Sequence, residues 1–350
     1  MYAFAIDNNN VIASLQDVMK VCIWEGSSAF GGIKVVTPIV RIQSQNIKNN
    51  IFIKRDDLLP FSFGGNKVRI AQEFFADMKV KGKNCIIGYG NARSNLSRAI
   101  ANMAYAEGIE CHIVCPMDED GGREETFNQK LVGHCDAIFH YCTKSEVSKT
   151  VSSVIVECRN KGLNPYYING DQYGKGNEGV PVRAYTKTFQ QIYQQSKDMG
   201  MVFDYIFLPV GTGMTQAGLL VGQKQVGSCE KIVGISIARS KDIELPILKS
   251  YVCAGVEDKK LECVEDTKIQ ICDEYLCGGY GKYDEDVEKV ILNMFTGSGI
   301  PLDPTYSGKA FCGMFKYIVA HNITNKNILF LHTGGTPLFF DYINKQNSNG

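Results

Sequence analysis

The sequence lacks several features that would place it at once in a common functional class. Basic and acidic residues are equal in number, 37 of each, and neither sign forms a long run. This balance argues against a protein that binds nucleic acid or another polyanion. No apolar run approaches the roughly 18 residues of a membrane-spanning helix. The first residues also lack the apolar core of a secretion signal. We therefore expect no nucleic-acid partner and no membrane partner.

Motifs for disulfides, zinc and serine hydrolysis are absent as well. The 13 cysteines show no disulfide framework in their spacing and no CxxC pair. Several of them, such as Cys85 and Cys111, lie in apolar runs, where a thiol behaves as a small hydrophobic side chain. The five histidines form neither HExxH nor a Cys/His pairing at zinc-finger spacing, so no metal is expected. No GxSxG occurs. A cytoplasmic location is the simplest expectation, because cytoplasmic thiols stay reduced.

Short apolar runs alternate with helical patterns along most of the 350 residues. The expected strands are residues 84–90, 110–116, 136–141, 165–170, 204–211, 231–238 and 327–335. The expected helices are residues 95–108, 122–133 and 187–198. Nearly unbroken apolar strands separated by helices are typical of parallel sheets covered on both faces. The predicted fold class is α/β, and the chain is long enough for two domains.

Four of the expected strands end in segments rich in glycine, serine or threonine. They are GYGNARSN (88–95), PVGTGMTQAG (209–218), LCGGYGKY (276–283) and LHTGGTP (331–337). Each segment alone fits a tight turn. In open α/β sheets, however, ligands bind where strands end and helices begin. Four such segments in one chain favour a cofactor site.

The strongest local pattern is a glycine and threonine loop between a strand and a helix of small residues. It consists of Gly211, Thr212, Gly213, Met214 and Thr215. Glycine N–H groups and a helix N-terminus together favour a bound phosphate. The loop is not a Walker A motif, since no Gly-Lys-Ser/Thr follows, and Gln216 occupies the third glycine position of GxGxxG. A lone phosphate is therefore expected rather than a nucleotide.

A lysine stands in an unusual place in FGGNKVR (63–69), where Lys67 begins an apolar-periodic helical run. The positive end of the helix dipole disfavours an ammonium there by roughly 0.3–1 kcal/mol. The side chain either reaches into water or is not an ordinary surface charge. A lone phosphate together with this lysine suggests pyridoxal phosphate, whose aldehyde bonds to a lysine amine.

The segment IFIKRDDLLPFSFGGNKVR (51–69), followed by GNARSN, resembles the aminocyclopropane-carboxylate deaminase and D-cysteine desulfhydrase family. The resemblance continues through the phosphate loop, LCGGYGKY, LDPTYSGKAF (302–311) and LHTGGTP, from about residue 37 onward. These proteins are pyridoxal-phosphate enzymes of the tryptophan-synthase-β type, fold type II, and are commonly homodimers. The resemblance implies two three-layer α/β/α domains with mostly parallel sheets. Residues 1–62 and 187–350 would form the large cofactor-binding domain, residues 63–186 the smaller one, and the active site the cleft between them.

The resemblance also implies residue roles on the amino-terminal side of the site. Lys67 would hold the cofactor as an internal imine, and residues 211–215 would bind its phosphate. Ser94 would contact the substrate carboxylate and assist proton movement. Asn95 would lie beside the cofactor ring and the substrate. Either Ser94 or Asn95 also fits a helix N-cap, which is the alternative reading.

Further roles fall on the carboxyl-terminal side. Tyr280 and Tyr306 match two active-site tyrosines, although a tyrosine beside glycines also occurs as a packing residue. Ser307 and Thr333 are the candidate partners of the pyridine nitrogen. The deaminase branch carries glutamate at the position of Ser307, so a hydroxyl there disfavours opening of a cyclopropane ring.

Four positions depart from the family pattern. Arg93 and Leu96 flank the Ser-Asn pair, where relatives carry glutamine and a histidine-like residue. Ile70 replaces a second lysine near the phosphate, and Arg69 is a possible substitute for its charge. Met214 replaces a glycine. Arg93 either binds a second carboxylate or a phosphate on a substrate, or points to solvent.

The leading expectation is a pyridoxal-phosphate-dependent lyase or deaminase. It would act on a small, D-cysteine-like amino acid by α,β-elimination and release a keto acid and ammonia. The alternatives are an aminocyclopropane-carboxylate deaminase, an amino-acid synthase that works by β-replacement, and a non-catalytic binding protein with the same fold.

Overall fold

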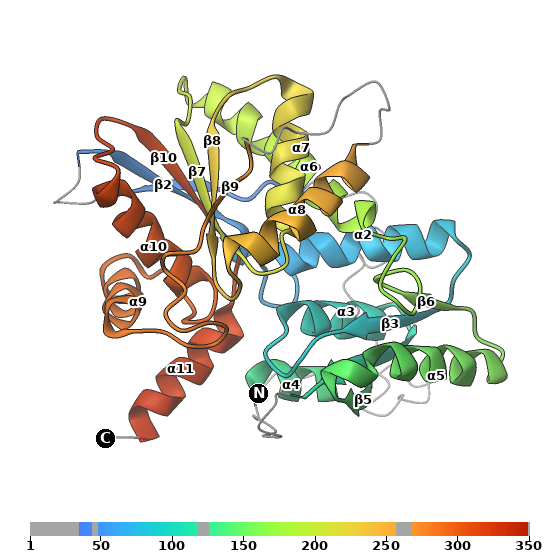
Figure 1. Ribbon diagram of the computed structural model, residues 1–350. Coiled ribbons are helices and arrows are strands. Elements are labelled where there is room, and N and C mark those ends of the chain that lie inside the picture. Colours follow the sequence, from blue (N-terminus) through green and yellow to red (C-terminus); the bar gives the residue numbers. More distant parts are fainter. Residues whose placement is uncertain (1–34, 44–47, 118–125, 257–267, 349–350) are drawn as a thin grey trace, which may run out of the picture. The chain divides into compact units, whose positions relative to one another are not determined.

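The computed structural model describes residues 35–43, 48–117, 126–256 and 268–348 (Figure 1). Some expectations lie outside the described residues. They concern residues 1–34 of the predicted large domain and the first residues of the helix expected at 122–133.

Ten strands in the described ranges form two sheets. The six-stranded sheet has the order β1 (Ile39–Ile42), β2 (Asn50–Arg55), β10 (Asn327–His332), β7 (Tyr205–Val210), β8 (Lys231–Ser236) and β9 (Gln270–Cys272). The four-stranded sheet has the order β5 (Ile138–Cys142), β4 (Glu110–Pro116), β3 (Cys85–Tyr89) and β6 (Pro165–Tyr167). β1 pairs with β2 in antiparallel fashion, and the remaining pairs are parallel.

Helices alternate with the strands, as parallel connections require. The α-helices are α2 (Asn66–Val80), α3 (Asn95–Ala106), α4 (Phe127–Gly133), α5 (Val147–Asn160), α6 (Gly179–Asp198), α7 (Met214–Val226), α8 (Lys241–Gly255), α9 (Glu285–Ser298), α10 (Ser307–Ala320) and α11 (Thr336–Ser348). Two short 3₁₀ helices are η1 (Asp56–Leu58) and η2 (Lys144–Glu146).

Helices pack on both faces of the six-stranded sheet, because consecutive residues of β8 contact different helices. A Cβ on Gly234 would come within 2.2 Å of Gln216 on α7, and one on Gly313 of α10 would come within 2.8 Å of Ile235. Successive strand residues point to opposite faces, so α7 and α10 cover opposite sides. Figure 1 shows the same arrangement, with α9 and α10 on one side of the sheet and α6, α7 and α8 on the other. Strands buried on both faces explain the unbroken apolar runs.

The α/β fold class predicted from the sequence is confirmed, and all seven expected strands are present. The helix expected from residue 187 begins earlier, at Gly179. Pro181 lies in its first turn, where the missing proline N–H has no intrahelical acceptor to lose. The predicted start at residue 187 was therefore about two turns too late.

Two further expectations concern cysteines and membrane helices. Ten described cysteines are free thiols, whereas Cys253 is disulfide-bonded and is an exception to the expected absence of a disulfide framework. Within the described ranges, none of the helices combines the length and the apolar composition of a membrane span.

Candidate active site

A cavity of about 850 Å³ lies at the carboxyl ends of strands from both sheets. Its lining includes Tyr89 and Pro116, which end β3 and β4, and Val210, which ends β7. It also includes nearly all the predicted site residues, namely Lys67, Arg93, Ser94, Asn95, Gly211, Thr212, Gly213, Met214, Thr215, Tyr280, Tyr306 and Thr333. Segments up to 266 residues apart, from Lys67 to Thr333, therefore meet around one cavity.

Ser307 is the exception among the predicted residues, because it does not line the cavity. Its hydroxyl is buried and donates a hydrogen bond to Asp303 Oδ1 over 2.7 Å. Ser307 Oγ also accepts a hydrogen bond from the Asp303 N–H over 2.8 Å. The Asp303 carboxylate in turn accepts the backbone N–H groups of Thr305, Tyr306 and Ser307 at the start of α10. The Ser307 hydroxyl thus closes the turn before α10, which leaves Thr333 as the hydroxyl candidate at the cavity.

The Gly-Gly-Asn turn before Lys67 packs directly against the segment that follows β10. A Cβ on Gly334 would lie 2.6 Å from the Gly65 Cα, so only glycine allows this approach. Both glycines also have positive φ, 94° for Gly65 and 92° for Gly334. Asn66 fixes the turn on two sides, since its N–H donates to the Thr333 carbonyl over 3.0 Å and its Nδ2 to Thr215 Oγ1 over 2.8 Å. Lys67, the second residue of α2, therefore lies where this turn meets the loops that carry Thr215 and Thr333.

The Lys67 amine is in an unfavourable place for a positive charge. Burial lowers its pKa from 10.5 to about 8. The first turn of α2 contains no acidic residue. Within the part of the chain that the structure describes, no acceptor lies within hydrogen-bonding distance of Nζ. The neutral, nucleophilic amine is therefore far more populated than in an ordinary lysine.

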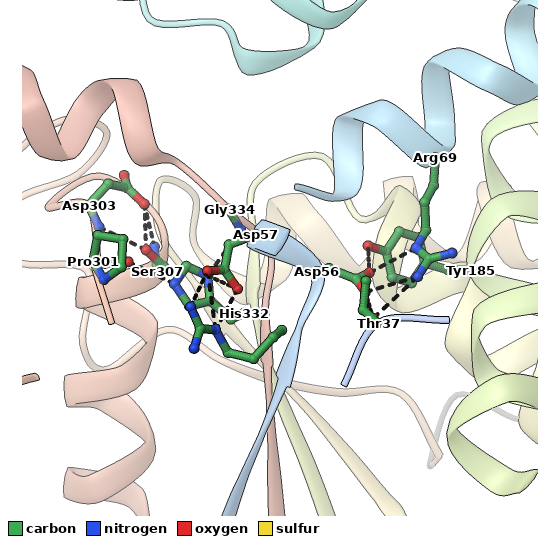
Figure 2. A network of polar contacts seen from close by, with 11 residues as sticks. Thr37, Asp56, Asp57, Arg69, Tyr185, Pro301, Asp303, Ser307, His332 and Gly334 are labelled. Carbon is green, nitrogen blue, oxygen red and sulfur yellow. Dashed lines mark hydrogen bonds and ion pairs between the residues drawn. The ribbon is translucent and has the colours of Figure 1, made fainter. Parts of the chain in front are cut away.

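Asp56 in the segment before this turn is buried and lies in a network of polar contacts (Figure 2). The Asp56 carbonyl accepts the Gly65 N–H over 2.7 Å. Its carboxylate accepts from Thr37 Oγ1 and Tyr185 Oη, both at 2.6 Å, and pairs with Arg69 at 3.0 Å. Burial alone would raise the pKa of Asp56, but the Arg69 charge and the hydrogen bonds outweigh burial and hold the pKa below its ordinary value. Because its guanidinium is engaged here, Arg69 does not supply the missing charge at the cavity.

The neighbouring Asp57 belongs to a second network, which holds the end of β10 (Figure 2). Asp57 pairs with Arg55 at 2.7 Å and lies 3.9 Å from His332 Nδ1. His332 Nδ1 accepts the Gly334 N–H over 3.1 Å, so Nε2 carries the ring proton and donates to the Pro301 carbonyl over 2.7 Å. A neutral histidine thus fixes the backbone beside Thr333.

The glycine and threonine loop forms the N-terminus of α7. Gly213 is the N-cap and has a φ of 76°, a conformation that favours glycine. Arg239, just after β8, donates to the Gly211 carbonyl over 3.1 Å and pairs with Glu244 at 3.0 Å. Arg239 lines the cavity and was not predicted, although its position after the strand next to β7 was a usable signal.

The loop before α3 supplies Arg93, Ser94 and Asn95. Ser94 is the N-cap of α3, since its Oγ accepts the Ser97 N–H over 3.1 Å, so the N-cap alternative is confirmed for this residue. It also lines the cavity. Arg93 lies against the loop that carries Tyr280, because a Cβ on Gly281 would come within 2.4 Å of Arg93 Nη1. This position on the cavity wall favours the ligand-binding alternative for Arg93.

The two predicted tyrosines form a pair. Their hydroxyl oxygens are 2.7 Å apart and their rings meet edge to face with centroids 5.9 Å apart. Burial raises the pKa of Tyr306 well above its ordinary value, and the Tyr280 hydroxyl raises it further. The Tyr306 hydroxyl therefore stays protonated at neutral pH.

Several polar or basic residues of the cavity lining went unpredicted. They include Asn66, Tyr89, Lys144, Asn169, Arg239 and Lys282. Among the described residues, no aspartate or glutamate lines the cavity. The cavity is thus suited to anionic ligands.

The model of the pyridoxal-phosphate dependent enzyme family matches residues 33–334 of this chain. The chain belongs to this family. Pyridoxal phosphate is accordingly the cofactor of this enzyme, and the predicted family is confirmed.

Individual relatives of this pyridoxal-phosphate enzyme agree with the assignment. It is 29% identical over 311 residues to D-cysteine desulfhydrase of Klebsiella pneumoniae subsp. pneumoniae, with 85% of this chain and 90% of that protein covered. A crystal structure of an ACC deaminase homologue matches with a TM-score of 0.78 at 28% identity, covering 90% of this chain and 94% of that one. O-ureido-L-serine synthase shares the fold, with a TM-score of 0.61 at 16% identity over 87% of this chain and 92% of that one.

Proposed function

We propose that this enzyme is a lyase that removes a β-substituent from a small amino acid by α,β-elimination, as the name D-cysteine desulfhydrase implies for its relative. The observation that carries the proposal is the Lys67 amine. It lies on the wall of the cavity, has a pKa lowered to about 8, and adjoins an anion-binding loop. The tyrosine hydroxyls line the same cavity.

The residues present fit the cofactor. The N–H groups of residues 211–215 and the N-terminus of α7 suit its phosphate. Arg239 supplies a cation beside this loop. Ile70, which stands where relatives carry a lysine, is buried and supplies no charge. The Lys67 amine is the nucleophile for the aldehyde, and the Thr333 hydroxyl is the partner proposed for the ring nitrogen. When bound, pyridoxal phosphate condenses with amines and stabilises negative charge at Cα.

The chain's own groups supply substrate binding and proton transfer. Ser94 and Asn95 at the N-terminus of α3 bind the substrate carboxylate, and Arg93 binds a further anionic group. The Lys67 amine is neutral enough near pH 8 to accept the α-proton. The Tyr306 hydroxyl, which a raised pKa keeps protonated, and its partner Tyr280 supply the proton to the departing β-group.

Ring opening of an aminocyclopropane carboxylate is the second candidate, favoured by the match to an ACC deaminase homologue. Ser307 no longer bears on this choice, because its hydroxyl is bound to Asp303. The fold match to O-ureido-L-serine synthase gives no argument for β-replacement, since its identity is only 16%.

We also propose the domain division expected from the sequence, with the cavity in a cleft between a large domain (1–62 and 187–350) and a small domain (63–186). Its support is a cavity wall that draws residues from both sheets. A homodimer in the cytoplasm is proposed as well. Light scattering tests the dimer, and cell fractionation tests the location. The disulfide bond of Cys253 is the one observation that argues against a reducing cytoplasm.

Product analysis tests the reaction. The purified enzyme with pyridoxal phosphate is mixed separately with D-cysteine, L-cysteine and 1-aminocyclopropane-1-carboxylate, with Lys67→Ala as the control. We expect sulfide, pyruvate and ammonia from a cysteine enantiomer. Release of 2-oxobutyrate from the cyclopropane instead would establish the second candidate. No keto acid from any of the three, with the cofactor bound, would contradict both.

A further inference from the structure

A cluster of potential metal ligands lies in the four-stranded sheet, away from the cavity. It consists of Cys85 on β3, Glu110 and His112 on β4, and Cys158 on α5. One ligand atom from each residue lies within 4.8 Å of all the others. Cys85, His112 and Cys158 have no exposed surface, and Glu110 is about one-third exposed. Three of the four side chains are thus fully buried, and only the carboxylate is partly exposed to solvent.

Three of the distances approach the edges of a tetrahedral coordination sphere. The two sulfur atoms are 3.6 Å apart, Cys158 Sγ is 3.4 Å from His112 Nε2, and Nε2 is 2.9 Å from Glu110 Oε1. Ordinary bond lengths to zinc give edges of about 3.8 Å for S–S, about 3.6 Å for N–S and about 3.4 Å for N–O. Outward movements of a few tenths of an ångström would therefore admit the ion.

The groups around the four ligands have the arrangement expected of an outer shell. His112 Nδ1 lies 2.9 Å from His140 Nε2, and metal-bound histidines usually make such a bond through the second ring nitrogen. Lys161 Nζ lies 3.4 Å from Glu110 Oε1. A divalent cation with two thiolates and a carboxylate carries one net negative charge, and the Lys161 ammonium balances it.

The cluster and the cavity lie at opposite ends of the same strands. Cys85 and Glu110 begin β3 and β4, whereas Tyr89 and Pro116 end them at the cavity. Four residues of β3 correspond to about 13 Å. None of the four cluster residues lines the cavity. Any ion bound here therefore has a role in holding the small sheet and α5 together, not in the reaction.

We propose that Cys85, Glu110, His112 and Cys158 bind a divalent cation of the zinc type. Two thiolates, one imidazole and one carboxylate in a near-tetrahedral pocket favour zinc over magnesium or calcium, which prefer oxygen ligands. Binding breaks two S–H bonds, forms two metal–sulfur bonds and releases two protons per ion to solvent.

Metal content of the purified holoenzyme is the first measurement. We expect one zinc per chain by elemental analysis, and cobalt added to the chelated protein should produce thiolate-to-cobalt absorption. Cys158→Ser and Cys85→Ser should each lose the zinc and this absorption. Cys111→Ser is the matched control, since Cys111 is equally buried on β4 but points to the opposite face. The Cys111→Ser chain should keep both signals.

The buried cysteine variants could fail to fold, so Glu110→Gln is a second test at a partly exposed position. This substitution should leave the fold intact and weaken zinc binding by about 10-fold or more. The cofactor absorption should persist in every folded variant, so the metal proposal can fail without the proposed function. The proposal is overturned if the wild-type chain holds no zinc and shows no cobalt–thiolate absorption. It is likewise overturned if Cys158→Ser and Glu110→Gln bind zinc as tightly as wild type.

Discussion

The surroundings of Lys67 and Lys309 differ in one respect that separates a reactive lysine from a structural one. Burial lowers the pKa of both. The Lys309 ammonium donates to three carbonyls, those of Ile237, Leu276 and Gly279, at 2.7–3.0 Å. The Lys67 amine has no acceptor within the described residues and lies on the cavity wall. A lowered pKa alone thus does not distinguish the two lysines, whereas the hydrogen bonds of Lys309 and the place of Lys67 on the cavity wall do.

Lys309 still serves the site indirectly. The three carbonyls that accept its hydrogen bonds connect the loop before Tyr280 to the chain just after β8, near Arg239. Lys309 is therefore a positioning residue for two walls of the cavity. The experiments below separate this role from that of Lys67.

Lys67→Ala should have the largest effect. Loss of the amine removes the covalent bond to the cofactor and the proposed base, so turnover should fall by about 10⁴-fold or more. The absorption band of the bound cofactor should disappear while the circular dichroism spectrum is retained. A Lys67→Ala chain that keeps the band would refute the assignment.

Lys309→Met should act on stability. It removes three charge-assisted hydrogen bonds and leaves the Ile237 carbonyl without a donor, whereas the Leu276 and Gly279 carbonyls still accept the N–H groups of Gly279 and Lys282. We expect the free energy of unfolding in urea to fall by about 1–3 kcal/mol. The cofactor band should remain in the folded fraction, because Lys67 is unchanged. Loss of the cofactor band from folded Lys309→Met would contradict a purely structural role for Lys309.

The pH dependence of cofactor attachment tests the lowered pKa of Lys67. Only the neutral amine attacks the aldehyde, so the rate with the cofactor-free chain should rise with pH and level off near pH 8. A water-exposed lysine would keep gaining rate up to its ordinary pKa of about 10.4. A profile still rising steeply at pH 9 would show that burial does not act on Lys67 as described.

Ser94→Ala should have the smallest effect, because Ser94 is both an N-cap and a cavity residue. Loss of the cap should lower the free energy of unfolding by about 1 kcal/mol. Thr126→Ala is the control, since Thr126 caps α4 outside the cavity lining and also donates to the Ala92 carbonyl. Thr126→Ala should lose at least as much stability as Ser94→Ala, but only Ser94→Ala should raise KM. An equal KM in both would leave Ser94 with the N-cap role alone.

The sequence predicted parts of the site that lie in one stretch of chain. The GGNK turn and residues 211–215 are contiguous, and their glycines and polar residues act through the local backbone. The roles of Ser307 and Arg69 were harder to predict. Their side chains bond to Asp303 and Asp56 and therefore do not reach the cavity. Those carboxylates meet their partners only in the folded chain.

The Cys85 and His112 cluster shows the same limit more strongly. Spacing rules exclude a metal only when its ligands share one loop or hairpin. Here the ligands come from β3, β4 and α5, and only the parallel register of Cys85 with Glu110 brings them together. The fold class was predictable because an unbroken apolar run indicates a strand that is buried on both faces. Contacts between elements that are distant in the sequence produce no comparable sequence pattern.

The central claim is that Lys67, and not another buried lysine, bonds to the cofactor. Borohydride reduction of the purified enzyme makes that bond permanent, and peptide mass spectrometry then locates it. The account predicts the pyridoxyl mass on Lys67. The same mass on Lys54 or Lys309, or on no lysine, would contradict it.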